Sequence, residues 1–333
     1  MDAAFPALMI RDEVAGSRRV QLTRLAADEL GEGAVEVAVH YSALNYKDAL
    51  GITGSGRVLQ DSPLVGGIDA AGEVVTAPAA SGLKPGDAVL VTGCGLGERH
   101  HGGFATRIRV PAGWVVPLPA GMDPRSAMIL GTAGFTAALA LQRLRDNHQT
   151  PQMGPVVVTG ASGGVGSLTV RLLSAQGFEV VAVSGKPALH DWIRSLGAVK
   201  VLERRGLPLG WRPLESARWA GAVDTLGGEI LAWLTRTVAE GGNIVAVGLA
   251  GGADLRTTVM PFILRGVALL GVSADHHPEA DRAAVWTRLG GDWAVPGLDR
   301  FVSEEIALGE VPAASRRMLA GQTHGRILVD VNR

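Results

Sequence analysis

The chain has very little cysteine and no excess of either charge. Cys94 is the single cysteine among 333 residues. An intrachain disulfide is therefore impossible, and a zinc site built from several thiolates is excluded as well. The chain carries 31 Lys and Arg against 32 Asp and Glu, with a formal net charge of −1. This balance, without a basic block, argues against nucleic-acid binding, which requires a clustered cationic face.

Long apolar runs are also missing. No stretch of about 18 uninterrupted apolar residues occurs, and the N-terminus lacks the basic-then-apolar order of a secretion signal. We therefore expect a soluble, cytoplasmic protein with no membrane partner. The hydrophobic fraction is 47%, which is enough for sizeable cores, and 333 residues exceed one typical domain. Two domains are the first expectation.

The interpretation is built on the stretch 155–166, PVVVTGASGGVG. Three valines, 156–158, predict a buried strand, small residues follow, and from about Val165 apolar residues recur at helical spacing as far as Gly177, a C-cap position. A strand, a glycine turn and a helix present free backbone N–H groups to a pyrophosphate. An ordinary tight strand–helix turn is the alternative. The candidate cofactor contacts are Ser162, Gly163, Gly164, Val165 and Gly166.

A second strand follows and ends in a group suited to phosphate. Residues 179–183 are strand-like, and Ser184, Gly185 and Lys186 come directly after them. In a βαβ dinucleotide site, an Asp or Glu at this point binds the 2′-hydroxyl of NAD and repels a phosphate. This chain has a hydroxyl, a glycine and a cation instead, so we expect NADPH as the cofactor. A solvated surface lysine is the alternative for Lys186.

Turn signals and strand–helix alternation divide the chain. Residues 1–125 contain short strand-like runs separated by glycine and proline, which is typical of a barrel-like β domain. From 126 to 298, strands alternate with helices, which predicts a parallel sheet covered on both faces. The tail from about 299 ends in a strand-like run, 326–331, which we expect to pair with the first domain. The predicted class is α/β, a β-barrel-type domain with a doubly wound parallel-sheet domain.

Several segments match a known family. The more specific are Leu44–Leu50 (LNYKDAL) and Thr257–Arg265 (TTVMPFILR), whereas TGASGGVG is shared by many reductases. On these segments the chain resembles the medium-chain dehydrogenase/reductase superfamily, and within it the zinc-free acryloyl-CoA reductase group, whose members were often labelled quinone oxidoreductases. Further matching segments are Gly67–Asp69, Gly97–His100, Gly131–Thr136, Val183–Lys186 and Gly248–Gly251.

The resemblance implies a fold, an activity and an assembly. The fold is a GroES-like substrate and catalytic domain from residues 1–125 and 299–333, with an inserted Rossmann domain at 126–298 that binds NADPH. The activity is reduction of the C=C bond of acryloyl-CoA without zinc. The assembly is a homodimer joined along a sheet edge of the Rossmann domain. The candidate edge strand is 267–272, because pairing would cover an apolar edge that is otherwise an aggregation hazard.

Tyr46 is the first catalytic candidate, placed near the nicotinamide. It is one of two tyrosines and is expected in the loop after a strand. Hydride transfer to the β-carbon of an unsaturated thioester builds negative charge on the thioester oxygen. A phenol can donate to that oxygen, or it can hold the nicotinamide. Asn45 and Asp48 flank Tyr46 and are candidates to orient it or a water, with turn chemistry as the alternative.

Other candidate cofactor contacts follow from the family pattern. Thr132, at the start of the GTAGFT helix, is a candidate for the cofactor phosphates or amide, although a helix hydroxyl can also bond back to its own backbone. Arg204 matches a family arginine near the adenosine phosphate, with Arg205 as the neighbouring alternative. Leu249 and Ile263 would pack near the nicotinamide, or belong to the plain core.

We expect no metal. Zinc-dependent relatives need an early Cys, a His-Glu pair and a later Cys or Asp. Here Asn45 stands at the early position, and the segment 67–69 (GID) has no His. His100 and His101 are adjacent, and adjacent side chains beside a strand point to opposite faces. Reduction of a polarised alkene needs no Lewis acid, whereas alcohol oxidation loses its usual activation without one.

Two other functions remain open at this point. One is an NADPH-dependent quinone or enone oxidoreductase on the same scaffold, which would share the cofactor site without affinity for CoA. The other is a non-catalytic NADPH-binding sensor. The intact LNYKD segment argues against the sensor.

Overall fold

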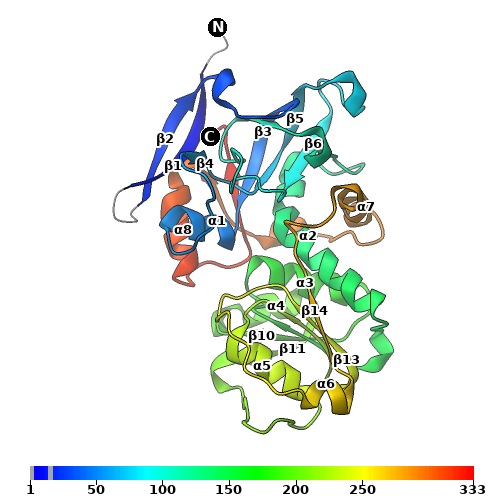
Figure 1. Cartoon of the computed structure of the whole chain (residues 1–333). Helices are drawn as coiled ribbons and strands as arrows, with labels where there is room; N and C mark the ends of the chain where they lie inside the picture. The colour runs from blue at the N-terminus through cyan, green and yellow to red at the C-terminus, as the bar shows by residue number, and fades with distance from the viewer. Residues whose placement is uncertain (1–3, 14–17) are drawn as a thin grey trace. The chain divides into compact units, whose positions relative to one another are not determined.

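The computed structural model describes residues 4–13 and 18–333. These residues form two compact units (Figure 1). Unit 1 comprises Met1–Thr132, Ala274–Gly291 and Gly297–Arg333, and unit 2 comprises Ala133–Ser273 and Asp292–Pro296. The chain therefore leaves unit 1 a few residues later than the expected boundary at 125, and residues 274–291 lie with unit 1 rather than with the nucleotide-binding part.

Unit 1 is built mainly from antiparallel β-structure. In the part of the chain that the structure describes, one of its sheets has the order β2-β1-β4 and a larger one the order β15-β16-β3-β5-β6-β8, with β7 paired to β3. The strands are β1 (Phe5–Asp12), β2 (Arg18–Leu25), β3 (Val35–Leu44), β4 (Leu64–Val65), β5 (Asp69–Thr76), β6 (Ala88–Thr92), β7 (Arg107–Val110), β8 (Val116–Pro117), β15 (Val302–Ala307) and β16 (Arg326–Asp330).

The C-terminal strand closes unit 1. β16 pairs antiparallel with β3, with Ile327 opposite Leu44. The expectation that the tail returns to the first domain is confirmed. Both residues are buried in the core of this unit, together with Leu8 of β1 and Phe104. The helices of unit 1 are α1 (Tyr46–Thr53), α7 (Glu279–Leu289) and α8 (Val311–Leu319).

Unit 2 contains a parallel sheet in the order β11-β10-β9-β12-β13-β14. If β9 is counted first, this is the order 3-2-1-4-5-6 of dinucleotide-binding folds, whose ligands bind beyond the carboxyl ends of the strands. The predicted parallel sheet is confirmed, and β14 lies at its edge, as expected for 267–272. The strands are β9 (Val156–Thr159), β10 (Val180–Ser184), β11 (Ala198–Glu203), β12 (Trp219–Asp224), β13 (Val238–Ala246) and β14 (Ala268–Gly271).

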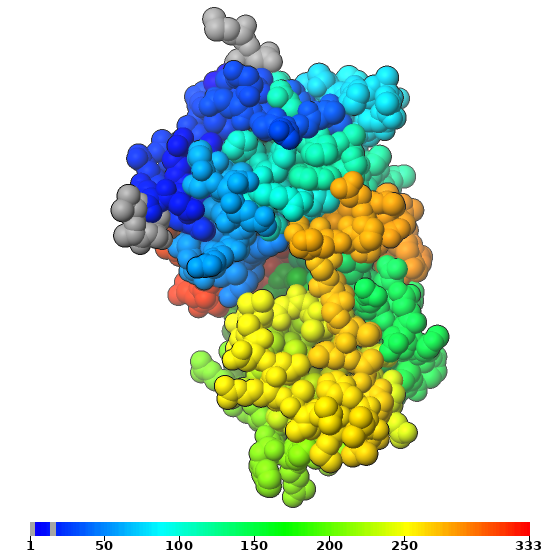
Figure 2. All heavy atoms as spheres, in the orientation of Figure 1, coloured from blue at the N-terminus to red at the C-terminus, as the bar shows by residue number. Residues whose placement is uncertain are grey.

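The helices of unit 2 follow its strands. They are α3 (Gly164–Ala175), α4 (His190–Ser195), α5 (Gly228–Thr237) and α6 (Met260–Arg265). Trp233 of α5 and Ile244 of β13 are fully buried in the core of this unit. The valine run of β9 is buried throughout, as a central parallel strand requires. The segment before α6, yellow in Figure 2, lies at the surface.

Helix α2 (Pro124–Asp146) links the two units in sequence. Its N-terminus is capped, because Ser126 N–H donates to Asp123 Oδ1 over 2.7 Å. Gly131 interrupts the helix with φ 50° and ψ −154°. By length and composition α2 could cross a membrane, but 83% of its most apolar window is buried. A core helix passes the same test, so α2 is weak evidence for a membrane span.

Candidate active site

The predicted glycine turn lies between β9 and α3 in unit 2. Gly160 follows β9 with φ +58°, and Gly163 is the N-cap of α3. A Cβ at Gly166 would lie 2.3 Å from Gly160 O, so only glycine allows the first turn of α3 to pack this closely on the strand end. This geometry leaves the first N–H groups of α3 without helical partners, as pyrophosphate binding requires. The candidates Ser162 to Gly166 lie together in this turn.

A buried aspartate, Asp224, forms hydrogen bonds next to the glycine turn that follows β9. Asp224, at the end of β12, accepts hydrogen bonds from Thr159 Oγ1 at 2.5 Å and from Gly227 N at 2.7 Å. Burial raises the pKa of Asp224, and the hydrogen bond from Thr159 acts against that rise. The hydrogen bond between Thr159 and Asp224 joins the carboxyl ends of β9 and β12. Sequence reasoning missed Asp224, although an acidic residue that ends an apolar strand was a usable signal.

The end of β10 carries the residues expected for a 2′-phosphate. Lys186 N–H donates to the buried Ser184 Oγ over 3.1 Å, which fixes the turn. A Cβ at Gly185 would lie 3.2 Å from Arg204 Nε, so the guanidinium lies against this glycine. Of the two adjacent arginines, Arg204 is the one at this turn. Burial lowers the pKa of Lys186. A hydroxyl and two cations at the end of the second strand fit a cofactor that carries a 2′-phosphate.

The two apolar candidates of unit 2 are exposed. Leu249 is 58% exposed and Ile263 is 72% exposed. Core packing therefore does not explain either residue. Leu249 lies beside the loop that follows β12, since a Cβ at Gly227 would be 3.3 Å from its Cα. Contact with a nicotinamide stays a prediction for both.

Tyr46 opens helix α1 in unit 1, whereas we expected it in a loop. Asn45 is the N-cap of α1, and Asn45 N–H donates to Asp48 Oδ2 over 2.9 Å. The other carboxylate oxygen of Asp48 accepts from Ile68 N–H over 2.9 Å. This capping arrangement starts the helix, and sequence reasoning did not weigh it. Tyr46 itself is 40% exposed, so its phenol can reach a ligand.

Asn45 and Asp48 are largely occupied within the fold. Asn45 Nδ2 donates to Asp69 Oδ2 over 2.8 Å and to Ala43 O over 3.2 Å, and its Oδ1 accepts from Arg326 Nη1 over 3.0 Å. An amide has two hydrogens, and both of these are engaged. Burial raises the pKa of Asp48 to about 7. Catalytic roles for these two residues stay predictions, and the contacts favour positioning of Tyr46.

Asp69 is the centre of a buried polar cluster that sequence reasoning did not assign. Its side chain is 0% exposed, and Arg326 Nη2 lies 3.8 Å from its Oδ2. Arg326 also donates from Nε to Ile129 O over 2.9 Å. Burial lowers the pKa of Arg326, and the charge of Asp69 acts against that change. Thr132 joins the cluster through its hydroxyl, which donates to Asp69 Oδ1 over 2.6 Å.

Comparison with known proteins connects both units to one family. The family described as "Alcohol dehydrogenase GroES-like domain" matches residues 31–120, and "Zinc-binding dehydrogenase" matches residues 164–288. The acrylyl-CoA reductase AcuI of Ruegeria pomeroyi is 44% identical over 98% of this chain and 99% of its own length.

The chain belongs to the medium-chain dehydrogenase/reductase family. Solved structures of this family agree with the fold. The YhdH protein of E. coli K-12 with bound NADPH has a TM-score of 0.93 and 46% identity, covering 98% of this chain and all of that one. Bacillus subtilis protein yhfP with NAD bound has a TM-score of 0.94 and 38% identity, covering 99% of this chain and all of that one. The predicted GroES-like and Rossmann architecture is confirmed.

In this member of the medium-chain dehydrogenase/reductase family, the two adjacent histidines have structural partners. His100 Nε2 lies 2.6 Å from Glu32 O, and Val65 N–H donates to His101 Nδ1 over 3.0 Å. Within residues 4–13 and 18–333, no three His, Cys, Asp or Glu side chains are placed to hold a metal ion. The position expected for an early cysteine ligand is filled by Asn45 and its hydrogen bonds.

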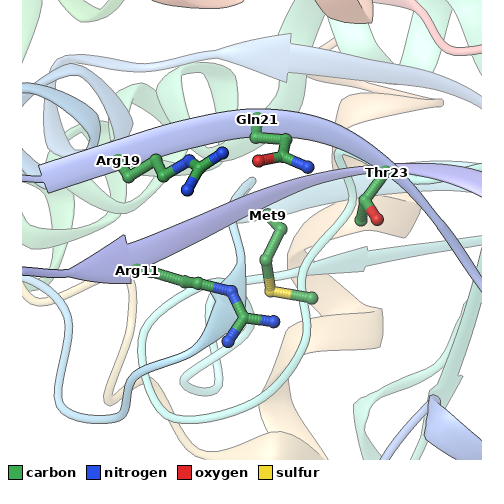
Figure 3. A pocket seen from close by; sticks show the side chains of 5 residues that line it. All are labelled: Met9, Arg11, Arg19, Gln21 and Thr23. Carbon is green, nitrogen blue, oxygen red and sulfur yellow. The ribbon is translucent and has the colours of Figure 1, made fainter.

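A small cavity lies apart from the candidate residues. It has a volume of about 40 Å³ and lies over the paired strands β1 and β2 of unit 1 (Figure 3). Its lining residues are Met9, Arg11, Arg19, Gln21 and Thr23. The volume suffices for a water molecule or two but not for a dinucleotide or a CoA ester.

Proposed function

We propose that this protein reduces the C=C bond of a short 2-enoyl-CoA with NADPH, converting acryloyl-CoA to propanoyl-CoA. The oxidoreductase class follows from the family to which the chain belongs, and the NADPH bound in the 46% identical E. coli structure supports NADPH as the cofactor. The finer assignment of substrate rests on similarity along the whole chain to the R. pomeroyi acrylyl-CoA reductase. The cations of Lys186 and Arg204 at the end of β10 are the observation that supports NADPH over NADH.

The proposed chemistry asks little of the protein side chains. Bound NADPH would supply a hydride for the β-carbon of the thioester, and a proton from solvent or a positioned acid would complete the reduction at the α-carbon. The phenol of Tyr46 then donates a hydrogen bond to the thioester oxygen, on which negative charge develops. Asn45 and Asp48 hold the first turn of α1 and thereby the backbone of Tyr46. No metal is required, since the thioester already polarises the alkene.

The experiment follows NADPH absorbance with three oxidants: acryloyl-CoA, free acrylate and a quinone. Turnover confined to the CoA ester supports the proposal. Turnover with the quinone alone would replace it by the quinone or enone oxidoreductase, and no turnover with any of the three would favour the NADPH-binding sensor. Free acrylate is the matched control, because it has the same alkene without the thioester and the CoA.

We also propose a homodimer in the cytoplasm. β14 is an edge strand whose Leu269 is 36% exposed. Antiparallel pairing of β14 with its copy would satisfy the unpaired backbone groups of the edge. Light scattering after size exclusion tests the dimer, and a Leu269→Pro substitution, which removes an N–H donor that points away from β13 at the free edge, should shift the protein toward the monomer.

A further inference from the structure

The hydroxyl of Thr132 is a donor toward Asp69, which leaves only its oxygen, as an acceptor, for another group. Its Oγ1 donates to Asp69 Oδ1 over 2.6 Å, and its backbone N–H lies 3.0 Å from both carboxylate oxygens. A threonine hydroxyl has one hydrogen to donate. Because that hydrogen is committed to a buried carboxylate, Thr132 Oγ1 can only accept a hydrogen bond from a further polar group.

The groups around Asp69 keep its carboxylate an acceptor, so the direction of the hydrogen bond from Thr132 to Asp69 cannot reverse. Asn45 Nδ2 donates to Asp69 Oδ2 over 2.8 Å, and the guanidinium of Arg326 lies beside the same oxygen at 3.8 Å. These neighbours are donors, so the carboxylate serves as an acceptor toward all of them. Gly131 makes the close approach possible, because a Cβ there would lie 2.5 Å from Asp69 Oδ2. The interruption of α2 at Gly131 is also what turns the N–H of Thr132 toward Asp69.

We propose that Thr132 Oγ1 accepts a hydrogen bond from the carboxamide NH2 of the nicotinamide, and that Asp69 is the positioning residue that sets this polarity. The sequence left two contacts open for Thr132, the cofactor phosphates and the amide. Phosphate oxygens only accept, so they gain nothing from a hydroxyl oxygen that also accepts, whereas the carboxamide presents N–H donors. The inference rests on the proposed function for its cofactor but not for its substrate.

The test measures binding rather than turnover. Isothermal titration calorimetry gives the affinities for NADP⁺ and for its 3-acetylpyridine analogue, in which a methyl group replaces the NH2. The wild type should prefer NADP⁺ by about twofold to tenfold, the value of one net hydrogen bond. Thr132→Val, which replaces the hydroxyl by a methyl group, should remove this preference, and Thr132→Ser should keep it. A wild type without the preference, or a valine variant that retains it, would overturn the proposal.

Asp69→Asn tests the positioning role. The asparagine NH2 can donate to Thr132 Oγ1, which frees the hydroxyl hydrogen to turn toward the ligand. We expect the preference for NADP⁺ over the analogue to fall while NADP⁺ still binds. A folded variant with the full wild-type preference would remove Asp69 from this role, and if the variant does not fold, the two Thr132 variants still decide the contact. A protein that lacks acryloyl-CoA turnover but shows the expected preference would refute the proposed substrate alone.

Discussion

The ammonium group of Lys47 lies 2.5 Å from Glu98 Oε1, and so joins two of the segments on which the family resemblance rests. Lys47 belongs to LNYKD and follows Tyr46 on α1, while Glu98 belongs to the segment 97–100 (GERH). Asp275 Oδ2 lies 3.6 Å from the same ammonium. Glu98 is buried, whereas the side chain of Lys47 is 36% exposed. The ion pair ties the start of α1 to a second loop of unit 1.

Because Glu98 is buried and Lys47 is partly exposed, the two single substitutions should lower the free energy of unfolding by different amounts. Lys47→Met leaves a buried carboxylate uncompensated and should lower the free energy of unfolding by about 2–3 kcal/mol, less than for a fully buried pair because the lysine is partly solvated. Glu98→Gln leaves an ammonium that water can solvate, so its cost should stay below about 1 kcal/mol. Urea unfolding of both variants and of the double variant at pH 7.5 gives the coupling. Equal losses in the two single variants would contradict this assignment.

Tyr46→Phe tests whether the phenol acts in the chemical step rather than in the binding of NADPH. Tyr46 is 40% exposed at the start of α1, so removal of its hydroxyl should leave the fold intact. Loss of one donor to the developing negative charge should lower kcat by about 100-fold. The dissociation constant of NADPH should change by less than about threefold. A variant with the wild-type rate on acryloyl-CoA would exclude Tyr46 from the mechanism.

Lys186→Ala and Arg204→Ala should change the choice of cofactor. Each removes one cation from the end of β10, and a charge-assisted hydrogen bond to phosphate contributes roughly 1.5–3 kcal/mol. NADPH affinity should fall by about 10-fold to 100-fold in each variant, with NADH affinity unchanged. Lys200→Ala is the matched control, because Lys200 is an exposed lysine on the neighbouring strand β11. An unchanged ratio of NADPH to NADH affinity in the Lys186 variant would refute the phosphate site.

The spacing of apolar residues predicted the strands and helices of unit 2 better than those of unit 1. Strands of a parallel sheet are buried on both faces and appear as apolar runs, as in 156–158, so β9 and its neighbours were recognisable. Helix α1 was not, because it has eight residues and depends on hydrogen bonds from Asn45 N–H and Ile68 N–H to Asp48. Arg326 begins β16 just before the apolar residues 327–329, and its partner Asp69 is far away along the chain. A pairing between residues so far apart in the sequence depends on the tertiary fold and cannot be predicted from local sequence patterns.

Asp48 should make stability fall as the pH rises. Its pKa is raised from 3.8 to about 7 in the folded chain, chiefly by burial. Between about pH 4 and pH 7 the folded state therefore binds more protons at this site than the unfolded state, and each pKa unit corresponds to about 1.4 kcal/mol. The stabilising contribution of Asp48, taken as the difference in unfolding free energy between wild type and Asp48→Asn, should decrease across this window by up to about 4 kcal/mol and level off above it.

Asp123→Asn provides the control for this prediction, because the pKa of Asp123 is shifted in the opposite direction. The hydrogen bond from Ser126 N–H lowers the pKa of Asp123. The contribution of Asp123 is therefore fully present above its ordinary pKa of 3.8 and is lost only at lower pH, so the corresponding difference should stay constant from pH 5 to pH 8, while that of Asp48 decreases up to about pH 7. Urea unfolding of the wild type and both variants at pH 5, 6, 7 and 8 measures the two slopes. Parallel slopes would show that Asp48 titrates at an ordinary value, with its carboxylate stabilised by the two backbone donors that it accepts from.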